Sequence, residues 1–193
     1  MKEKAITISI IGHRDLLAEH YDIIKNRIEV ILQNVKDQHP NTSLRFMSPL
    51  AEGSDQLGAD VAVSMGFQLI VPLPMEPKEY LKNFDENSKQ IFDNLLIQAH
   101  EHCVLRCNKC LSKEDHYLNL GKYLIQNSNI LLVLWDGQFS DKIGGTGYLM
   151  NQIYEIKQTS SLLRKIIHLR IPRKSNPFTE NSFQIEEIDI IFQ

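Results

Sequence analysis

The sequence predicts an α/β fold: a doubly wound, mostly parallel sheet (Rossmann-like) with helices on both faces. Three observations favour it. Short apolar, β-branched runs alternate with longer stretches in which apolar residues recur every three or four positions. The short runs are mostly apolar, and residues 130–135 are apolar throughout, which is typical of strands buried on both faces. Glycine-bearing loops lie between several of these runs and the helical patterns that follow, so the backbone can come close to a ligand there.

The first half of the chain is expected to be β-α-β-α-β. Residues 7–11 form the first strand, which stops at a Gly-His-Arg-Asp turn. A helix is expected from Leu16, with Asp15 as its N-cap, because one apolar stripe continues as far as Val35. After a break at His39-Pro40-Asn41, we expect a strand at 44–47, a helix at 54–65 ended by Gly66, and a strand at 67–71.

The second half continues the alternation. Three prolines between residues 72 and 77 force an extended segment, and a helix start is expected near Lys78. Residues 130–135, Ile-Leu-Leu-Val-Leu-Trp, are the most apolar run and are expected to form a central strand. The other expected elements are helices at 85–100, 115–127 and 145–158, a weak strand at 103–107 and a core strand at 166–170.

Residues 1–172 are therefore predicted to form one Rossmann-like domain, which suits a chain of 193 residues with 42% hydrophobic composition. The composition changes from Arg173 onward, and residues 173–193 are predicted to be a C-terminal tail or linker. Within this segment, residues 184–192 fit a strand, a short helix or a disordered tail. The sequence leaves these alternatives open.

The charge balance gives no support for a polyanionic partner. Lys and Arg number 21 and Asp and Glu 24, a net charge of −3, so neither nucleic acid nor an anionic membrane is expected as a partner. No apolar run approaches the roughly 20 residues needed to span a bilayer. The N-terminal Met1-Lys2-Glu3-Lys4 leads directly into a strand rather than a signal-peptide core, so a cytoplasmic location is expected.

The three cysteines, Cys103, Cys107 and Cys110, lie close together. An odd number of cysteines in a chain without an export signal argues against a disulfide framework. The spacing of Cys107 and Cys110 fits one half of a zinc knuckle, and Cys103 with a nearby histidine can complete four ligands. The second half of such a motif is missing, however, so we expect no metal and small buried side chains beside a loop.

The residues that suggest chemistry gather at one edge of the predicted sheet. In open α/β sheets, ligands lie beyond the carboxyl ends of the strands, where the strand order reverses. Backbone N–H groups at a helix start have no intrahelical partner, so a phosphate can accept hydrogen bonds from them. The candidate phosphate- and nucleotide-binding residues at this edge are Gly12, His13, Arg14, Glu52, Gly53, Asp55, Asp136, Gly137, Gly144, Gly145, Thr146 and Gly147.

Each candidate also has a structural explanation. Asp55 can be a first-turn acid, Arg14 a surface charge and the glycines turn residues. His13 can be an acid or base, a donor to phosphate or a plain polar residue. The Gly-Gly-Thr-Gly cluster at 144–147 is the hardest to explain by turn geometry alone. Because neither G-x-G-x-x-G nor a P-loop occurs, the sequence argues against a standard NAD-dependent dehydrogenase and a P-loop ATPase.

Five motifs in order resemble the bacterial SLOG superfamily. They are Ile-Gly-His-Arg-Asp (11–15), Ser-Pro-Leu-Ala-Glu-Gly-Ser-Asp-Gln-Leu-Gly-Ala-Asp (48–60), Ile-Val-Pro-Leu-Pro (70–74), Leu-Trp-Asp-Gly (134–137) and Gly-Gly-Thr-Gly (144–147). That superfamily unites Rossmann-like domains related to the LOG phosphoribohydrolases, the lysine decarboxylase-like proteins and DNA-processing protein A. The resemblance covers residues 5–170.

The resemblance implies a nucleotide-binding domain that requires no cofactor and senses a nucleotide or an NAD- or ADP-ribose-like ligand. It implies phosphates on Arg14 and residues 144–147, and ribose on Glu52 or Asp136. Its implied partners are the small-molecule nucleotide, an effector domain or protein, and further copies of the chain in a homodimer or higher homo-oligomer.

A LOG-like phosphoribohydrolase, which cleaves nucleoside monophosphates at the N-glycosidic bond, is the alternative function. LOG enzymes carry a catalytic glutamate shortly after their glycine motif, where this chain has Met150. Methionine cannot act as a base, so an enzyme would need Glu52 or Asp136 as its catalytic carboxylate. A scaffold that only dimerises is a third hypothesis.

Overall fold

The computed structural model describes residues 5–158, 162–173, 176 and 181–190. One sheet of seven strands runs through this part of the chain in the order β4-β3-β2-β1-β5-β6-β7. All neighbouring strands are parallel except β6 and β7, which are antiparallel. The strands are β1 Ala5–Gly12, β2 Ser43–Met47, β3 Gln68–Leu73, β4 Glu101–Val104, β5 Ile130–Trp135, β6 Lys165–Arg170 and β7 Ile185–Asp189.

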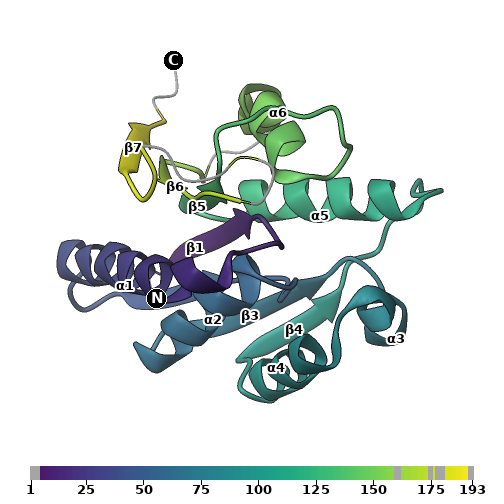
Figure 1. Ribbon diagram of the computed structural model, residues 1–193, viewed down its shortest axis with the longest axis horizontal. Coiled ribbons are helices and arrows are strands. Elements are labelled where there is room, and N and C mark those ends of the chain that lie inside the picture. Colours follow the sequence, from purple (N-terminus) through teal and green to yellow (C-terminus); the bar gives the residue numbers. More distant parts are fainter. Residues whose placement is uncertain (1–4, 159–161, 174–175, 177–180, 191–193) are drawn as a thin grey trace.

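Helices cover both faces of this sheet, as Figure 1 shows. On one face, α1 (Tyr21–Gln38), α2 (Ser54–Ser64) and α4 (Glu86–Ile97) bury Ile28, Leu57 and Phe92 in one core. On the other face, α5 (Lys113–Gln126) and α6 (Thr146–Gln158) bury Leu124 and Leu149 in a second core. A short helix, α3 (Pro77–Tyr80), and two 3-10 turns, η1 (Ala18–His20) and η2 (Leu81–Asn83), complete the described elements. The predicted doubly wound α/β fold is confirmed.

Strand β5 holds the two cores together. All six of its residues are buried, and they alternate between the cores, with Leu132 and Leu134 on one side and Val133 and Trp135 on the other. Strand β1 pairs with β2 on one edge and with β5 on the other, so the strand order reverses between β1 and β5. A crevice at the carboxyl ends of these two strands is the expected ligand site of such a sheet.

The start of the first long helix differs from the prediction. The chain after Arg14 remains non-helical, makes the turn η1 and enters α1 only at Tyr21. The predicted N-cap role of Asp15 is therefore wrong. The Asp15 carboxylate instead accepts a hydrogen bond from the Arg173 guanidinium at 3.1 Å, a partner that lies 158 residues away and that local sequence does not reveal.

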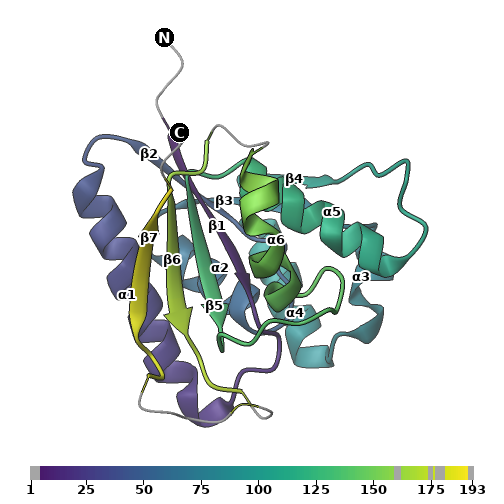
Figure 2. The same ribbon diagram turned by 90° about the horizontal axis from the view of Figure 1, so that it is seen from above.

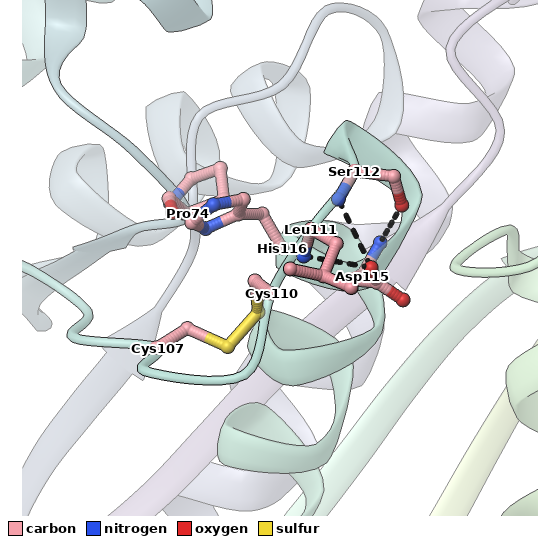
Figure 3. Close-up of a disulfide and its surroundings, with 7 residues drawn as sticks. All are labelled: Pro74, Cys107, Cys110, Leu111, Ser112, Asp115 and His116. Atoms are coloured by element: carbon pink, nitrogen blue, oxygen red, sulfur yellow. Dashed lines mark hydrogen bonds between the residues drawn. A yellow bond between two sulfur atoms is a disulfide. The ribbon is translucent and has the colours of Figure 1, made fainter.

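The cysteine segment also differs from the prediction. Cys103 is exposed in the edge strand β4, and Cys107 and Cys110 form a disulfide within the loop that precedes α5 (Figure 3). The expectation of small buried side chains is wrong for Cys103, because β4 is the edge strand of the sheet and all of its residues are exposed. The cysteine count, which argues against a disulfide framework, did not predict this single local disulfide. No cluster of three or more His, Cys, Asp or Glu residues in the described part of the chain is placed to hold a metal ion.

The C-terminal segment adds the last strand to the sheet. Of the three alternatives for residues 184–192, the described residues 184–190 contain strand β7, which pairs along the whole of its length with β6. Phe183 and Ile190 on either side of β7 are buried. No helix among the described residues is both long and apolar enough to cross a membrane.

Candidate functional site

A cleft of about 460 Å³ opens at the carboxyl ends of β1 and β5, where the strand order reverses. It is lined by the loop after β1, the start of α2, Tyr80 of α3, the first half of α5 and the loop that leads into α6. Figure 2 shows α5 and α6 beside one another on this side of β1 and β5. Of the predicted site residues, Gly12, His13, Arg14, Asp55, Gly144, Gly145, Thr146 and Gly147 line the cleft.

The loop after β1 is fixed by the start of α2. Both the backbone N–H and the hydroxyl of Ser54 donate to the carbonyl oxygen of His13, at 3.1 and 2.8 Å. Gly53 has a φ of 79°, and a side chain there would collide with the backbone carbonyl of Arg14. Only glycine therefore lets the two loops pack this closely, and this packing sets the position of Arg14.

The Arg14 side chain reaches the cleft between two aromatic rings. Its guanidinium lies 5.3 Å from the ring centre of Tyr117 and 5.8 Å from that of Phe84. Such cation–π contacts hold the planar group while its N–H edge stays able to donate. Within the described part of the chain, no carboxylate forms an ion pair with Arg14. A planar donor in this state is suited to a phosphate or carboxylate of a ligand.

Asp55 lies in the first turn of α2, where its side chain is buried but lines the cleft. Burial raises the pKa of Asp55 to about 8, against the opposing effects of the Arg14 charge and the Ala51 backbone N–H. The carboxyl group is therefore largely protonated at neutral pH and does not cancel the charge of Arg14. Its Oδ1 atom has no hydrogen-bond partner among the described residues.

The opposite side of the cleft is the start of α6. The backbone N–H of Gly145 donates to the carbonyl of Lys142 at 3.0 Å, so it is not available to a ligand in this arrangement. The N–H groups of Thr146 and Gly147, which also line the cleft, have no backbone acceptor in the described part of the chain. These two groups sit at the positive end of the helix and can donate to an anion.

His13 and Asp136 join the two sides of the cleft. His13 Nε2 lies 3.1 Å from Asp136 Oδ1, and His13 Nδ1 lies 3.4 Å from the Arg173 guanidinium. Burial lowers the pKa of His13, with Asp136 opposing this effect, so the ring is neutral at pH 7. Burial alone would raise the pKa of Asp136, but the hydrogen bond from the Gln138 N–H and the contact with His13 lower it below its usual value. This pair positions the loops around it.

Four predicted residues do not line the cleft: Glu52, Gly53, Asp136 and Gly137. The Glu52 carboxylate accepts from the backbone N–H of Asp85 at 2.9 Å, and thus ties the α2 loop to the start of α4. The Asp136 carboxylate accepts from the backbone N–H of Gln138 at 3.0 Å. Both carboxylates accept hydrogen bonds from backbone N–H groups. These structural contacts account for the presence of the two acidic residues in the motifs, and no ligand is needed to explain them.

Comparison with solved structures finds the same fold in proteins of very different sequence. DNA processing protein A from Streptococcus pneumoniae has a TM-score of 0.52 at 14% identity, over 79% of this chain and 48% of that one. The chain thus spans about half the length of that protein. This chain has the same kind of Rossmann-like α/β fold as that protein. The comparison supports the fold that the five motifs predict.

Two further structures are similar to this chain at lower scores. DNA processing protein A from Helicobacter pylori has a TM-score of 0.46 at 12% identity, over 81% of this chain and 74% of that one. The molybdenum cofactor carrier protein from Chlamydomonas reinhardtii has a TM-score of 0.46 at 9% identity, over 88% and 77%. No protein-family model and no curated protein matches the sequence.

These comparisons correct one expectation. The net charge led us to expect no nucleic-acid partner, yet the similar structure from Streptococcus pneumoniae is that of a DNA processing protein. The expectation is wrong because net charge averages over the whole surface, whereas the fold places Arg14, Lys113, Lys142 and Arg173 around one cleft.

Sequence reasoning missed several residues that line the cleft, notably Tyr80, Tyr117, Lys142 and Arg173. Tyr80 follows the proline-rich segment after β3 and belongs to no motif. Tyr117 lies in α5, within the predicted helix at 115–127, and belongs to none of the motifs. Arg173 was assigned to a tail, although it reaches His13 and Asp15 across most of the chain. Nothing in the local sequence of these residues signals the site.

Proposed function

We propose that this domain binds a nucleotide or a nucleotide-derived ligand of the AMP, ADP-ribose or NAD type in the cleft, and acts as a sensor for it. The observation that carries the proposal is the Arg14 guanidinium, which lies in the cleft without an ion-pair partner among the described residues. Two aromatic rings hold its face, and the Tyr117 side chain accepts one of its hydrogen bonds. The remaining N–H groups of the guanidinium can bind an anion.

The charges around Arg14 support an anionic ligand. Lys113 and Arg173 at the cleft are partly neutralised by Glu79 and Asp15, but Lys142 has no such partner in the described part of the chain. Asp55 is largely uncharged at neutral pH. The free N–H groups of Thr146 and Gly147 add the positive end of α6. A phosphate fits this set of donors better than a neutral or cationic group does.

The hydrolase alternative finds less support. An N-glycosidic hydrolase needs an ionised carboxylate close to the sugar, and neither Glu52 nor Asp136 lines the cleft. Among the described residues, three carboxyl groups do line it: Asp15 is paired with Arg173, Asp55 is largely protonated at neutral pH, and Glu114 is exposed in the first turn of α5, at the outer end of that helix. We therefore propose binding without turnover. Release of free adenine from AMP by the purified protein would contradict this part of the proposal.

Calorimetric titration with AMP, ADP-ribose, NAD and a cyclic nucleotide tests the proposal. We expect saturable binding of at least one of them, weakened about 10- to 100-fold in Arg14→Ala, because a charge-assisted hydrogen bond contributes about 1.5–3 kcal/mol. Arg27→Ala is the matched control, since Arg27 is exposed on α1, outside the cleft lining. The absence of saturable binding, or equal binding by Arg14→Ala, would contradict the proposal.

A single-stranded oligodeoxynucleotide belongs in the same series. The oligonucleotide presents phosphodiesters instead of a terminal phosphate. Its binding affinity falls steeply with salt concentration when the protein contacts several phosphates. Tighter binding of the oligonucleotide than of every mononucleotide, with a steep salt dependence, would replace the proposed ligand class with nucleic acid.

A further inference from the structure

Two buried polar atoms in the cleft have no hydrogen-bond partner among the described residues. They are Oδ1 of Asp55 and the hydroxyl oxygen of Tyr80. Asp55 is 7% exposed and Tyr80 is 2% exposed, and both residues line the cleft. A buried donor or acceptor that stays unsatisfied costs about 1–3 kcal/mol, so such groups are rare in folded proteins unless a ligand completes them.

The residues around these two atoms indicate which part of a ligand can form hydrogen bonds with them. The Tyr80 ring packs against Phe84 and Phe92, with ring centres 5.1 and 6.2 Å apart. The ring is therefore held in place, and its hydroxyl is left without a hydrogen-bond partner among the described residues. The Arg14 guanidinium that we expect to bind the phosphate lies over Phe84 and Tyr117, next to this aromatic group. The two polar atoms and the expected phosphate position therefore share one side of the cleft.

The hydrogen-bonding capacity of Asp55 and Tyr80 indicates which chemical groups of a ligand they can bind. A tyrosine hydroxyl donates and accepts, and so does a protonated carboxyl group. Burial keeps the pKa of Asp55 at about 8, so this carboxyl group is mostly protonated at pH 7. A metal ion is disfavoured here because Arg14 is close and the carboxyl group is mostly neutral. A neutral group that both donates and accepts suits this pair, and sugar hydroxyls have that property.

We propose that Asp55 and Tyr80 form a subsite for the ribose hydroxyls of the nucleotide bound at Arg14, so that the cleft selects ribonucleotides over deoxyribonucleotides. This inference rests on the proposed function. It replaces the sequence-based assignment of ribose to Glu52 or Asp136, whose carboxylates lie outside the cleft lining. Each hydroxyl of the sugar would satisfy a buried atom that is otherwise unpaired.

The test compares AMP with 2′,3′-dideoxy-AMP, which has the same base and phosphate but lacks both hydroxyls. For the wild type we expect AMP to bind at least about tenfold more tightly, the equivalent of one to two hydrogen bonds. In Tyr80→Phe we expect the affinity for AMP to fall about fivefold while the affinity for 2′,3′-dideoxy-AMP stays the same. The control is Tyr21→Phe, because Tyr21 is exposed on α1 and outside the cleft lining.

The outcomes separate this inference from the proposed function. If AMP and the dideoxy nucleotide bind equally and Arg14→Ala weakens both, the ribose subsite is wrong and the nucleotide site stands. If neither of these two nucleotides binds, the ribose subsite is wrong as tested with AMP, and the proposed function is overturned as well when ADP-ribose, NAD and the cyclic nucleotide also fail to bind. If Tyr80→Phe weakens both nucleotides equally, Tyr80 shapes the cleft and does not read the sugar.

A second measurement needs no ligand. Because the Tyr80 hydroxyl has no partner in the described part of the protein, Tyr80→Phe should melt at the same temperature as the wild type or higher. A clear drop in melting temperature would show that the hydroxyl has a structural partner, and would overturn the subsite.

Discussion

The two sides of the cleft are built differently. We call the first the strand wall, residues 12–15 and 49–55, and the second the loop wall, residues 138–147. In the strand wall, Ser54 and Asp55 are buried, and the buried Ser48 directly before it donates a hydrogen bond from its hydroxyl to the Asp55 carbonyl at 2.9 Å. The Ser54 hydroxyl donates to the His13 carbonyl. In the loop wall, residues 138–143 are exposed, and Phe139 is 66% exposed.

This difference assigns separate roles to the two walls. The strand wall belongs to the core, so it holds Arg14 and Asp55 in place before a ligand arrives, and changes in it should alter the stability of the whole domain. The loop wall rests on a few turn hydrogen bonds, such as that from Gly145 to Lys142. Changes there should alter ligand affinity with little effect on stability.

The largest expected effect in the strand wall is that of Asp55→Asn, and it depends on pH. The pKa of Asp55 is about 8 in the folded chain because of burial, against 3.8 for a free side chain. Between these values the folded chain keeps a proton that the unfolded chain has released, so wild-type stability falls as pH rises from about 4 to about 8. Asparagine does not titrate. The variant should therefore gain stability relative to wild type by up to about 5 kcal/mol across this window.

Urea unfolding of wild type and Asp55→Asn at several pH values across this window measures the effect. Asp22→Asn is the control, because Asp22 is exposed in the first turn of α1. A stability difference that does not change with pH would show that Asp55 is ionised in the folded chain, and that the strand wall carries a negative charge beside Arg14.

The next effect is that of Gly53→Ala compared with Gly66→Ala. Both glycines have a positive φ, 79° and 83°, which costs an alanine about 1 kcal/mol. A Cβ at Gly53 would also collide with the Arg14 carbonyl, whereas a Cβ at Gly66 meets nothing within 4 Å. We expect a loss of about 3 kcal/mol for Gly53→Ala and about 1 kcal/mol for Gly66→Ala, measured by urea unfolding. Equal losses would mean that the packing between the two loops of the strand wall does not matter.

Asp136→Ala tests the junction between the two walls. The substitution removes the acceptor of the Gln138 N–H and the partner of His13. We expect a loss of about 2 kcal/mol at pH 7. Since the Gln138 N–H and His13 hold the pKa of Asp136 below 3.8 in spite of partial burial, the stabilisation is present above that pH and is lost as the pH falls further. Thermal unfolding at neutral and acidic pH would reveal a loss that shrinks in acid; a loss of equal size at both would contradict this explanation.

The smallest expected effect on stability is that of Ser140→Ala in the loop wall. The Ser140 hydroxyl accepts from the backbone N–H of Lys142 at 3.1 Å in an exposed loop, so its removal should cost less than about 0.5 kcal/mol. The same change should weaken AMP binding about threefold, because Lys142 in turn positions Gly145 by a hydrogen bond. A large loss of stability with unchanged binding would reverse the roles that we assign to the two walls.

The sequence predicted the secondary structure best where the pattern of apolar residues determines the fold. The apolar run at residues 130–135 predicted a central strand, and the edge of the sheet that collects Arg14, Asp55 and residues 144–147 follows from the alternation of strands and helices. Motif position alone was less informative. Glu52 lies within a motif that resembles SLOG proteins, yet its carboxylate binds the Asp85 N–H.

Long-range partners could not be predicted. Arg173 contacts Asp15 from 158 residues away, and Tyr80 enters the cleft from a short helix after a proline-rich segment. Net charge was misleading for the same reason, because it does not report where the cations gather. These features depend on which chain segments the fold brings together, and a single sequence carries no local signal for them.

A crystal structure of the protein with bound AMP tests the central claim most directly. We predict the phosphate in the cleft, with its oxygens within hydrogen-bond distance of the Arg14 guanidinium and of the Thr146 or Gly147 backbone N–H. A nucleotide bound elsewhere on the protein, or one in the cleft with its phosphate turned away from Arg14, would contradict the account.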